Sequence, residues 1–328
     1  MAFVRNAIFL AILGLAAHVA FFFFNPNISG KVRKEVRILE GSSFKAVSEL
    51  LTERRLITNP LYFNLLGKWS KKDQKIKPGL YVLHTAMRPM DILDMLVEGK
   101  ISQKEVIIRE GLSDREIAKI FYEAGLGAEQ DFLAATQDPV LLHEFGIAAE
   151  SMEGYLFPDT YFVAEGASPE DIIKQMVGRF KSTFNALIEK EDISSELTQR
   201  EIVILASIID KETSFGAERE IISAVFHNRI RQGMRLQSDP TVIFGLPNFN
   251  GNLTRKNLMT PTPYNTYTIP GLPPGPIGNP GGAALAAAMS PAEVDYIYFV
   301  SKNDGTHYFS KTLDEHNNAV NKYQRNQN

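Results

Sequence analysis

The sequence predicts a mixed α+β protein with an N-terminal transmembrane helix, a small strand–helix module and a larger α+β domain. An apolar run lies near the N-terminus, and a strand–turn–helix pattern begins at Lys34 and again at Lys104. Beyond the second copy, segments with the periodicity of helices and of strands alternate to the C-terminus. We expect four parts: a tip and anchor over 1–25, a module over 26–103, a second strand–helix unit with a connector over 104–150, and the larger domain over 151–328.

Composition excludes several classes of protein. The chain has 328 residues, of which 44% are hydrophobic and 22% charged, so it is a folded protein of more than one domain rather than a disordered or fibrous one. It has no cysteine, which excludes disulfides, thiolate metal sites and a cysteine nucleophile. The 35 basic and 38 acidic residues give no overall positive charge for binding nucleic acid. Catalysis would therefore fall to carboxylates, hydroxyls or the six histidines.

The N-terminal run predicts a membrane anchor. Ala7–Phe24 is apolar apart from His18, and at about 1.5 Å per residue it nearly crosses a hydrocarbon core about 30 Å thick. It ends in four phenylalanines and shows no small-x-small cleavage site, which favours an uncleaved anchor over a cleaved signal peptide or a buried helix. Basic residues flank the run on both sides, so charge counting leaves its orientation open.

The repeated pattern predicts two small structural units. KEVRILEGSS from Lys34 and KEVIIREGLS from Lys104 share Lys, Glu, Val, Ile, Glu, Gly and Ser at the same offsets. Each copy predicts a strand, a turn at Gly41 or Gly111, and a helix capped by a serine hydroxyl. A further strand at Gly79–Leu83 precedes another amphipathic helix. Such units are similar to LysM-like modules, which bind glycan chains. A small packing domain without a ligand is the alternative.

Later segments alternate in the same way. We expect helices around Asp131–Phe145, over Pro169–Phe184 and over Ala283–Met289, each from its apolar spacing. Asp295–Ser301 predicts a buried strand, and HYFSKTLDEHNNAV predicts a strand followed by the last helix.

Aromatic residues surround carboxylates in MEGYLFPDTYFV. Glu153, Tyr155 and Asp159 lie in this segment, and sugars commonly dock on aromatic faces beside carboxylates. The alternative is a rigid turn between domains in which Asp159 serves as a cap.

A second candidate acid follows an apolar helix. Thr198 with Glu201 three residues later forms a capping-box pattern, and the run from Ile202 to Ile209 is apolar on nearly every side. Glu212 stands at the end of this helix, where partial loss of hydration raises a carboxyl pKa and suits it to general acid catalysis. Asp210 is two residues away and cannot share its helix face. A plain solvated helix end is the alternative.

The loops after that helix indicate the kind of ligand. The stretches 226–246 and 253–285 are rich in glycine, proline, asparagine, threonine and tyrosine. Uncharged polar side chains on proline-rigid loops suit a hydroxyl-rich ligand better than phosphate or a metal ion. A saccharide is the natural candidate.

A family resemblance rests on these same segments. ASIIDKET, VFHNRIRQGMRLQSDPTVIFGL, LTRKNL, PYNTY, GLPPGPIGNPG and EHNNAV, in this order, closely resemble the endolytic murein transglycosylases of the YceG-like family. The resemblance spans at least Met152–Val320. It implies a single-pass protein of the bacterial inner membrane with its catalytic domain in the periplasm. Its substrate would be nascent peptidoglycan strands, whose elongation it would terminate near the peptidoglycan synthases, without a cofactor or a metal.

The resemblance also implies the residues of the site. The catalytic glutamate of the KET triplet falls on Glu212, which would protonate the departing oxygen and then deprotonate the muramoyl 6-hydroxyl to close a 1,6-anhydro ring. Family members often carry Glu where this chain has Asp210, which leaves the role of Asp210 open. Asn228 and Arg229 are expected to orient the cleft wall. The expected substrate-binding residues are Glu153, Asn228, Gln237, Ser238, Asp239, Thr241, Tyr264, Asn265 and Tyr267.

Three other functions compete with this one. A muramidase-type hydrolase would pair Glu212 with Asp239 or Glu153, at about 5–5.5 Å for retention or about 6.5–9.5 Å for inversion. A peptidoglycan-binding scaffold would have no catalytic acid. A metal hydrolase would use side chains from the C-terminal segment, but no HExxH pair occurs, which disfavours it. Its ligands would be His307, His316, Asp304 and Glu315.

Overall fold

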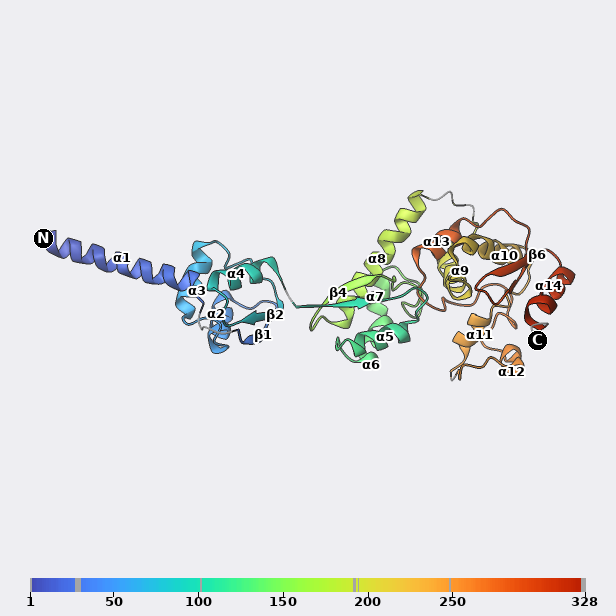
Figure 1. Ribbon diagram of the computed structural model, residues 1–328, viewed down its shortest axis with the longest axis horizontal. Coiled ribbons are helices and arrows are strands. Elements are labelled where there is room, and N and C mark those ends of the chain that lie inside the picture. Colours follow the sequence, from blue (N-terminus) through green and yellow to red (C-terminus); the bar gives the residue numbers. More distant parts are fainter. Residues whose placement is uncertain are drawn as a thin grey trace. The chain divides into compact units, whose positions relative to one another are not determined.

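The chain forms two compact units in the computed structural model (Figure 1), which describes residues 2–26, 31–100, 102–190, 193, 195–247 and 249–325. Unit 1 comprises Met1–Glu105 and Phe162–Ala167, and unit 2 comprises Val106–Tyr161 and Ser168–Asn328. Helices and short strands are mixed in the chain, as the sequence predicts. The LysM-like character of the first module and the four-part division stay predictions.

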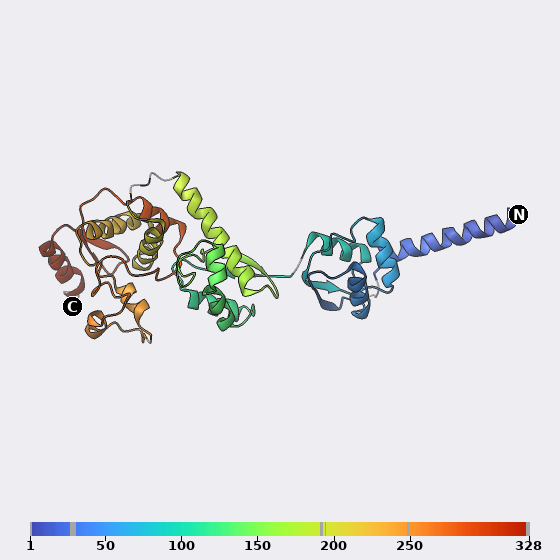
Figure 2. The same ribbon diagram turned by 180° about the vertical axis from the view of Figure 1, so that it is seen from behind.

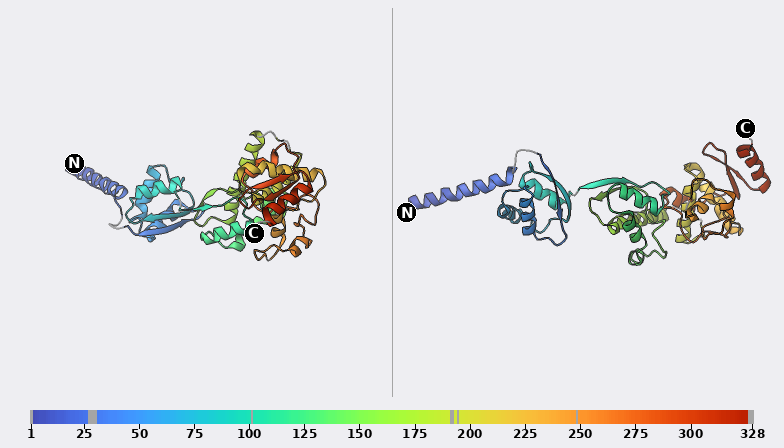
Figure 3. Two further views of the ribbon diagram at one scale, coloured as in Figure 1. Left: turned by 45° about the vertical axis from the view of Figure 1, so that its right-hand side comes forward. Right: turned by 90° about the horizontal axis from the view of Figure 1, so that it is seen from below.

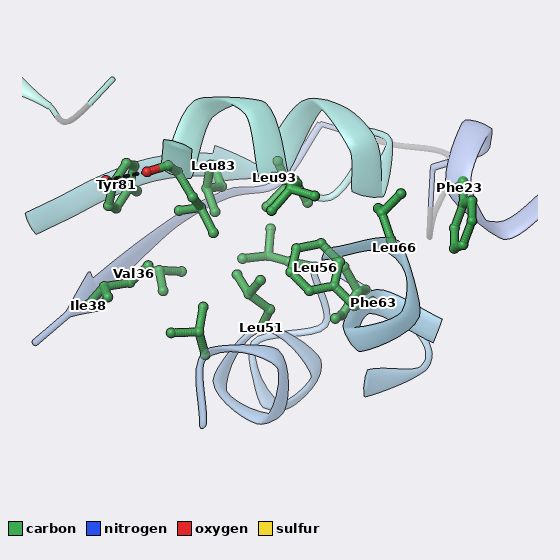
Figure 4. Packing of buried hydrophobic residues seen from close by; sticks show 14 residues of the cluster. Phe23, Val36, Ile38, Leu51, Leu56, Phe63, Leu66, Tyr81, Leu83 and Leu93 are labelled. Carbon is green, nitrogen blue, oxygen red and sulfur yellow. Dashed lines mark hydrogen bonds between the residues drawn. The ribbon is translucent and has the colours of Figure 1, made fainter. Parts of the chain in front are cut away.

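Unit 1 packs helices against a two-stranded sheet. Its elements are α1 (Ala2–Phe24), β1 (Arg33–Ile38), α2 (Phe44–Glu53), α3 (Pro60–Trp69), β2 (Gly79–His84) and α4 (Pro89–Glu98). β1 pairs antiparallel with β2, with Val36 opposite Tyr81. Their inward side chains join those of the helices in one buried cluster, and Figure 4 shows Phe23 of α1 at its edge. The end of α1 is thus part of the core of unit 1.

The turn and cap signals of the first repeat copy act as predicted. Gly41 has a φ of 77°, a conformation that favours glycine, and the hydroxyl of Ser43 accepts a hydrogen bond from the Ala46 N–H at the start of α2. The second copy repeats both features at Gly111 and Ser113. The local structure of the repeat is confirmed.

Helix α1 carries the predicted apolar character. Val4–Phe24, 21 residues with a mean hydropathy of 2.4, is long and apolar enough to cross a membrane, and only 7% of it is buried in the protein. This is consistent with a single-pass anchor. The identity of the membrane and the side on which the rest of the chain lies stay predictions.

Unit 2 is built mainly from helices. β3 (Gln103–Ile107) pairs with β4 (Thr160–Ala164), and the boundary between the units passes through both strands. Figure 2 shows α8 as a long single helix in yellow-green. The remaining elements are α5 (Asp114–Glu123), α6 (Glu129–Thr136), α7 (Pro139–Glu144), α8 (Pro169–Lys190), α9 (Gln199–Glu212), η1 (Gly216–Glu218), α10 (Arg219–Arg231), α11 (Asp239–Gly245), α12 (Arg255–Met259), α13 (Gly282–Met289), β5 (Tyr298–Ser301), β6 (His307–Ser310), α14 (Leu313–Val320) and η2 (Asn321–Arg325).

Two predicted elements differ from the structure. The stretch Asp131–Phe145 is two helices, because Pro139 begins α7 after the side chain of Asp138 accepts the Val140 N–H. The strand predicted from Asp295 begins at Tyr298 and is not fully buried: Val300 alone is buried within β5. β5 belongs to a two-stranded ribbon with β6, and α14 packs on both strands (Figure 3). A ribbon covered on one face buries fewer of its side chains than a central strand does.

The core of unit 2 surrounds α9. Every residue from Ile202 to Ile209 is buried, and α13, α10 and α11 pack against this helix. The predicted capping box is present, since Thr198 accepts the Glu201 N–H while the Glu201 carboxylate accepts the Thr198 N–H. A helix fixed at its start and enclosed along its length holds its last residue, Glu212, in a defined place.

Candidate active site

Glu212 ends α9 beside a loop that lies far away in the sequence. Its side chain is half-buried, and Ser238 Oγ donates a hydrogen bond of 2.5 Å to Glu212 Oε1. Within the described part of the chain, Ser238 is the one hydrogen-bond partner of this carboxyl. The carboxyl is therefore oriented through one of its two oxygens.

The surroundings of Glu212 keep it partly protonated at neutral pH. Burial raises the pKa of the Glu212 carboxyl to about 7. The Ser238 hydrogen bond and the positive charge of Arg229 oppose this rise, whereas the negative charge of Asp239 adds to it. A carboxyl with a pKa near the working pH can both give and take a proton.

Ser238 is itself held by two threonines. Thr266 Oγ1 accepts the Ser238 N–H at 3.0 Å, and Thr241 Oγ1 donates to the Ser238 carbonyl at 2.6 Å. The two threonine hydroxyls lie 2.8 Å apart and are hydrogen-bonded to each other. Ser238, Thr241 and Thr266 are all buried, so this network fixes the hydroxyl that orients Glu212.

Arg229 binds the residues that precede Ser238 in the same loop. This buried guanidinium donates to the Leu236 carbonyl at 2.7 Å and to the Ile297 carbonyl at 2.6 Å, and it lies over the ring of Tyr298. It also reaches Gln237 Oε1 at 3.4 Å. Gln237 is exposed and has a φ of 53°, which is uncommon for a residue other than glycine.

Asp239 and Tyr267 form a pair at the same site. The Tyr267 hydroxyl donates to Asp239 Oδ1 at 2.6 Å, and Asp239 is exposed. Burial and the neighbouring Asp239 carboxylate raise the pKa of Tyr267, so its hydroxyl keeps its proton. The pair offers a carboxylate oxygen and a phenol to a polar ligand.

Two predicted binding residues are engaged with the protein backbone. Asn265 is buried, and its Nδ2 donates to the carbonyls of Leu258 and Thr260. The Asn228 amide donates to the carbonyls of Val294 and Tyr296. Both side chains hold loops in place, and their contact with substrate stays a prediction.

Glu153 lies in a second cluster of unit 2. Its carboxylate accepts the Asp114 N–H and a hydrogen bond from Asn279 Nδ2, which also donates to Asp114 Oδ1. Asn279 Oδ1 accepts the N–H groups of Gly154 and Leu156. Burial raises the pKa of Asp114 to about 7, and burial together with the Asp114 charge raises that of Glu153 well above its usual value.

A cavity of about 610 Å³ borders this second cluster. Glu153, Arg200 and Tyr264 line it together with Pro276. The Tyr264 ring packs on Phe244 of α11, with the ring centres 4.8 Å apart. The structure thus groups Glu153 with Tyr264, and Glu212 with the Ser238, Asp239 and Tyr267 side chains.

The other residues of the aromatic segment make contacts inside the protein. Asp159 accepts a hydrogen bond from Arg179 at 2.7 Å, and the buried ring of Tyr155 packs edge-on against Phe180.

Asp210 faces different partners from Glu212. Its Oδ2 accepts the Gly281 N–H at 2.7 Å, and its Oδ1 lies 3.7 Å from Arg219 Nε. The side chain is only 2% exposed, and burial raises its pKa to about 6. Asp210 therefore ties the end of α9 to the loop before α13.

The histidines of the C-terminal segment are engaged elsewhere. His307 Nδ1 pairs with Glu218 at 2.7 Å, and the His316 ring stacks on Tyr298. In the described residues, no group of three or more His, Asp or Glu side chains is placed to hold a metal ion.

Sequence reasoning missed four residues around these sites. Thr266 follows Asn265 in a polar loop, and Arg200 lies in the first turn of α9, so neither has a distinctive local signal. Asn279 stands in a Gly/Pro-rich stretch that indicated only a loop. Asp114 could have been noticed, because it is a charged residue at the repeat position where the first copy has the apolar Phe44.

Comparison with known proteins decides the family. The sequence pattern of the YceG-like family matches residues 36–322. The chain belongs to the YceG-like family. This confirms the resemblance predicted from the sequence.

Individual YceG-like relatives support the same conclusion. A Bacillus subtilis protein named endolytic murein transglycosylase is 31% identical over 312 residues, covering 89% of this chain and 85% of the relative. A Streptococcus pneumoniae protein of the same name is 26% identical, and the match covers 95% of this chain but 63% of that longer relative. A crystal structure of a putative yceG-like protein from Listeria monocytogenes has a TM-score of 0.58 at 33% identity, covering 88% of this chain and 99% of that one.

Proposed function

We propose that this YceG-like protein is an enzyme, an endolytic peptidoglycan lytic transglycosylase with Glu212 as its catalytic acid. The observation that carries the proposal is the Glu212 carboxyl itself. It has a pKa of about 7, it is oriented by Ser238 through one oxygen, and it stands at the rim of a buried helix. The names of the relatives, endolytic murein transglycosylase, support this class of enzyme.

The proposed reaction uses one carboxyl twice. Protonated Glu212 gives its proton to the oxygen between N-acetylmuramic acid and N-acetylglucosamine, and the glycosidic bond breaks. The Glu212 carboxylate then takes the proton of the muramoyl 6-hydroxyl, whose oxygen bonds to C1 and closes a 1,6-anhydro ring. No water is consumed, and the enzyme returns to its protonated form. A pKa near 7 suits both steps.

The surrounding polar groups bind the sugar in this proposal. The negative Asp239, bonded to Tyr267, stabilises the positive charge that develops at C1. Gln237 is exposed beside Ser238 and is available to sugar hydroxyls. Thr241 acts through Ser238, and Asn228 and Asn265 act through the loops that they hold. Glu153 and Tyr264 line their own cavity, which we assign to sugars farther along the strand.

Helix α1 supports the proposed location. We propose that α1 anchors the chain in the bacterial inner membrane with both units in the periplasm, where nascent strands are made. Cleavage there would terminate strand elongation beside the peptidoglycan synthases. The LysM-like part of unit 1 would add contacts with glycan.

A hydrolase is the second candidate, because Asp239 is close enough to raise the pKa of Glu212. A hydrolase leaves reducing sugar ends, whereas a lytic enzyme leaves 1,6-anhydro ends. The test is to digest purified peptidoglycan with the full chain in detergent and to identify the product ends by mass spectrometry. We expect anhydro ends from the wild type. Reducing ends would establish the hydrolase, and peptidoglycan that binds but stays uncut would establish a scaffold.

A further inference from the structure

Helix α3 of unit 1 presents an apolar stripe that is mostly exposed in the described chain. Leu61, Leu65 and Trp69 are 70%, 55% and 70% exposed. Their spacing of four residues places them along one face of the helix, while Phe63 and Leu66 on the opposite side belong to the buried core. A contiguous exposed apolar face on a folded unit marks a contact surface.

The stripe lies beside the end of the anchor helix. Trp69 stacks on Phe23 of α1, with the ring centres 6.4 Å apart, and Tyr62 of α3 packs edge-on against Phe22 and His18. Phe21 and Phe24 in the same turns of α1 are 65% and 53% exposed. The last turns of α1 and the neighbouring helix α3 therefore both carry exposed apolar side chains.

The length of α1 indicates that the exposed stripe of α3 lies at the membrane. The apolar window Val4–Phe24 has 21 residues, which reach about 31 Å at about 1.5 Å each, against a hydrocarbon core about 30 Å thick. An anchor with so little spare length keeps its last turn at the edge of the hydrocarbon. Because Trp69 stacks on that turn, α3 cannot stand clear of the membrane.

The chemistry of α3 fits that position. Tryptophan is enriched where hydrocarbon meets the headgroups, and lysines beside an apolar face reach anionic lipids. Lys68 lies at the edge of the stripe, and Lys71 and Lys75 follow the helix; all three are exposed. Asp73 is the acidic residue among them.

We propose that α3 lies in the membrane interface, with Leu61, Leu65 and Trp69 inserted at the boundary between the headgroups and acyl chains of the membrane that α1 crosses. The proposal rests on α1 being an anchor, as in the proposed function. Two contacts instead of one would then hold unit 1 against the lipid surface.

Trp69 is the one tryptophan of the chain and reports directly on this surface. The full chain is reconstituted into vesicles of phosphatidylcholine and phosphatidylglycerol, with and without phosphatidylcholine brominated on its acyl chains. We expect brominated lipid to quench the Trp69 emission, most strongly with bromine near the headgroup end, and iodide in the water to quench it weakly. The proposal would be overturned if brominated lipid did not quench the Trp69 emission and iodide quenched it as strongly as in the urea-unfolded chain. The stripe would then be a binding surface for a protein partner.

Matched variants test the role of the leucines. The double variant Leu61→Asp, Leu65→Asp is expected to lower the quenching by brominated lipid and to raise the quenching by iodide. Val140→Asp, at a site that is 72% exposed on α7, serves as the control and is expected to change neither. Circular dichroism checks that each variant is folded. Unchanged quenching in the double variant would also refute insertion.

Alkaline extraction separates the two proposals. A chain that alkaline carbonate washes from the vesicles has no anchor, which would contradict the proposed location. A chain that resists extraction but shows no lipid quenching contradicts only the inserted α3.

Discussion

Unit 2 contains two sets of carboxyl groups whose pKa values are raised by burial, and they differ in how their oxygens are used. Glu212 has one hydrogen-bond partner in the described chain, Ser238. Glu153 accepts bonds from the Asp114 backbone and from Asn279, and Asp114 shares that amide. Both sets therefore share a raised pKa, and they differ in the number of hydrogen bonds that their carboxyl oxygens accept.

The two sets also differ in what they hold together. The Ser238 loop positions one carboxyl and leaves it half-buried. Asn279 joins two distant segments to its own loop, because it bonds to Leu112 and Asp114 in one of them and to the backbone of Gly154 and Leu156 in the other. We interpret the Glu212 set as reactive and the Glu153–Asp114–Asn279 set as a link that shapes the neighbouring cavity.

The largest expected effect separates the two glutamates. Glu212→Gln removes the transferable proton, so we expect the release of peptidoglycan fragments to fall by about 100- to 10,000-fold without loss of folding. Glu153→Gln is the matched control. Since the Glu153 pKa is raised well above its usual value, glutamine resembles its protonated form, and we expect a loss of less than about tenfold. Fragment release by both proteins is measured by chromatography of the soluble products. Equal losses would remove the distinction between the two sets.

The next effect concerns stability. Asn279→Ala leaves the buried N–H groups of Gly154 and Leu156 without their acceptor, and we expect the free energy of unfolding of unit 2 to fall by about 2–4 kcal/mol. Denaturant unfolding followed by circular dichroism measures it. Asn252→Ala, at an exposed site, is the control and should change the free energy of unfolding by less than about 0.5 kcal/mol. A stable Asn279→Ala protein would refute the linking role.

The two repeat copies show how far the sequence could predict the fold. Glycine turns and serine caps act over a few residues, so Gly41, Gly111 and Ser113 could be assigned correctly, and the cap of the first copy could be narrowed to Ser42 or Ser43. The surroundings of each copy could not be assigned. Position 44 is a phenylalanine that stacks on Phe63 in unit 1, whereas the equivalent Asp114 is buried against Glu153 in unit 2. Those partners come from distant segments, and periodicity carries no information about them.

The candidate site shows the same limit. Glu212 could be found because a local pattern, a capped apolar helix, ends on it. Its contact with Ser238 joins positions 26 apart, and the hydrogen bond from the Gly154 N–H to Asn279 Oδ1 joins positions 125 apart. The sequence predicted Ser238, Asp239 and Tyr267 as neighbours only through family resemblance. It did not show that Glu153 and Glu212 lie in different clusters, or that Asn265 bonds to the backbone of its own loop.

A third effect uses the pH dependence of stability. Burial raises the pKa of Asp114 to about 7 in the folded chain, against about 3.9 for an unfolded one. Between these values the folded state holds a proton that the unfolded state has lost, so stability present at low pH is lost as the pH rises towards 7. Asp114→Asn cannot titrate, and we expect its stability to fall less steeply with pH, by at most about 1.4 kcal/mol per pH unit.

Denaturant midpoints measured across this pH range would test the Asp114 prediction. Asp304→Asn is the control, because hydrogen bonds from Thr306 lower the pKa of Asp304, the opposite direction from that of Asp114. Glu153, Asp210 and Glu212 titrate in the same direction as Asp114, so a residual slope remains in the variant. A slope identical to that of the wild type would show that Asp114 is ionised in the folded protein.

The smallest effect comes from the single bond to Glu212. The Ser238 hydroxyl stabilises the carboxylate form, so Ser238→Ala raises the pKa of Glu212 further above about 7. Activity that needs the protonated acid falls as the pH rises through this pKa. We therefore expect the alkaline limb of the pH–rate profile to move upward by up to about one pH unit in the variant, since one such bond contributes about 1 kcal/mol. If the alkaline limb stays at the same pH while the rate falls, Ser238 orients the acid without changing its pKa. If the limb moves to lower pH, the Ser238 hydrogen bond does not stabilise the carboxylate form of Glu212, and the prediction is wrong.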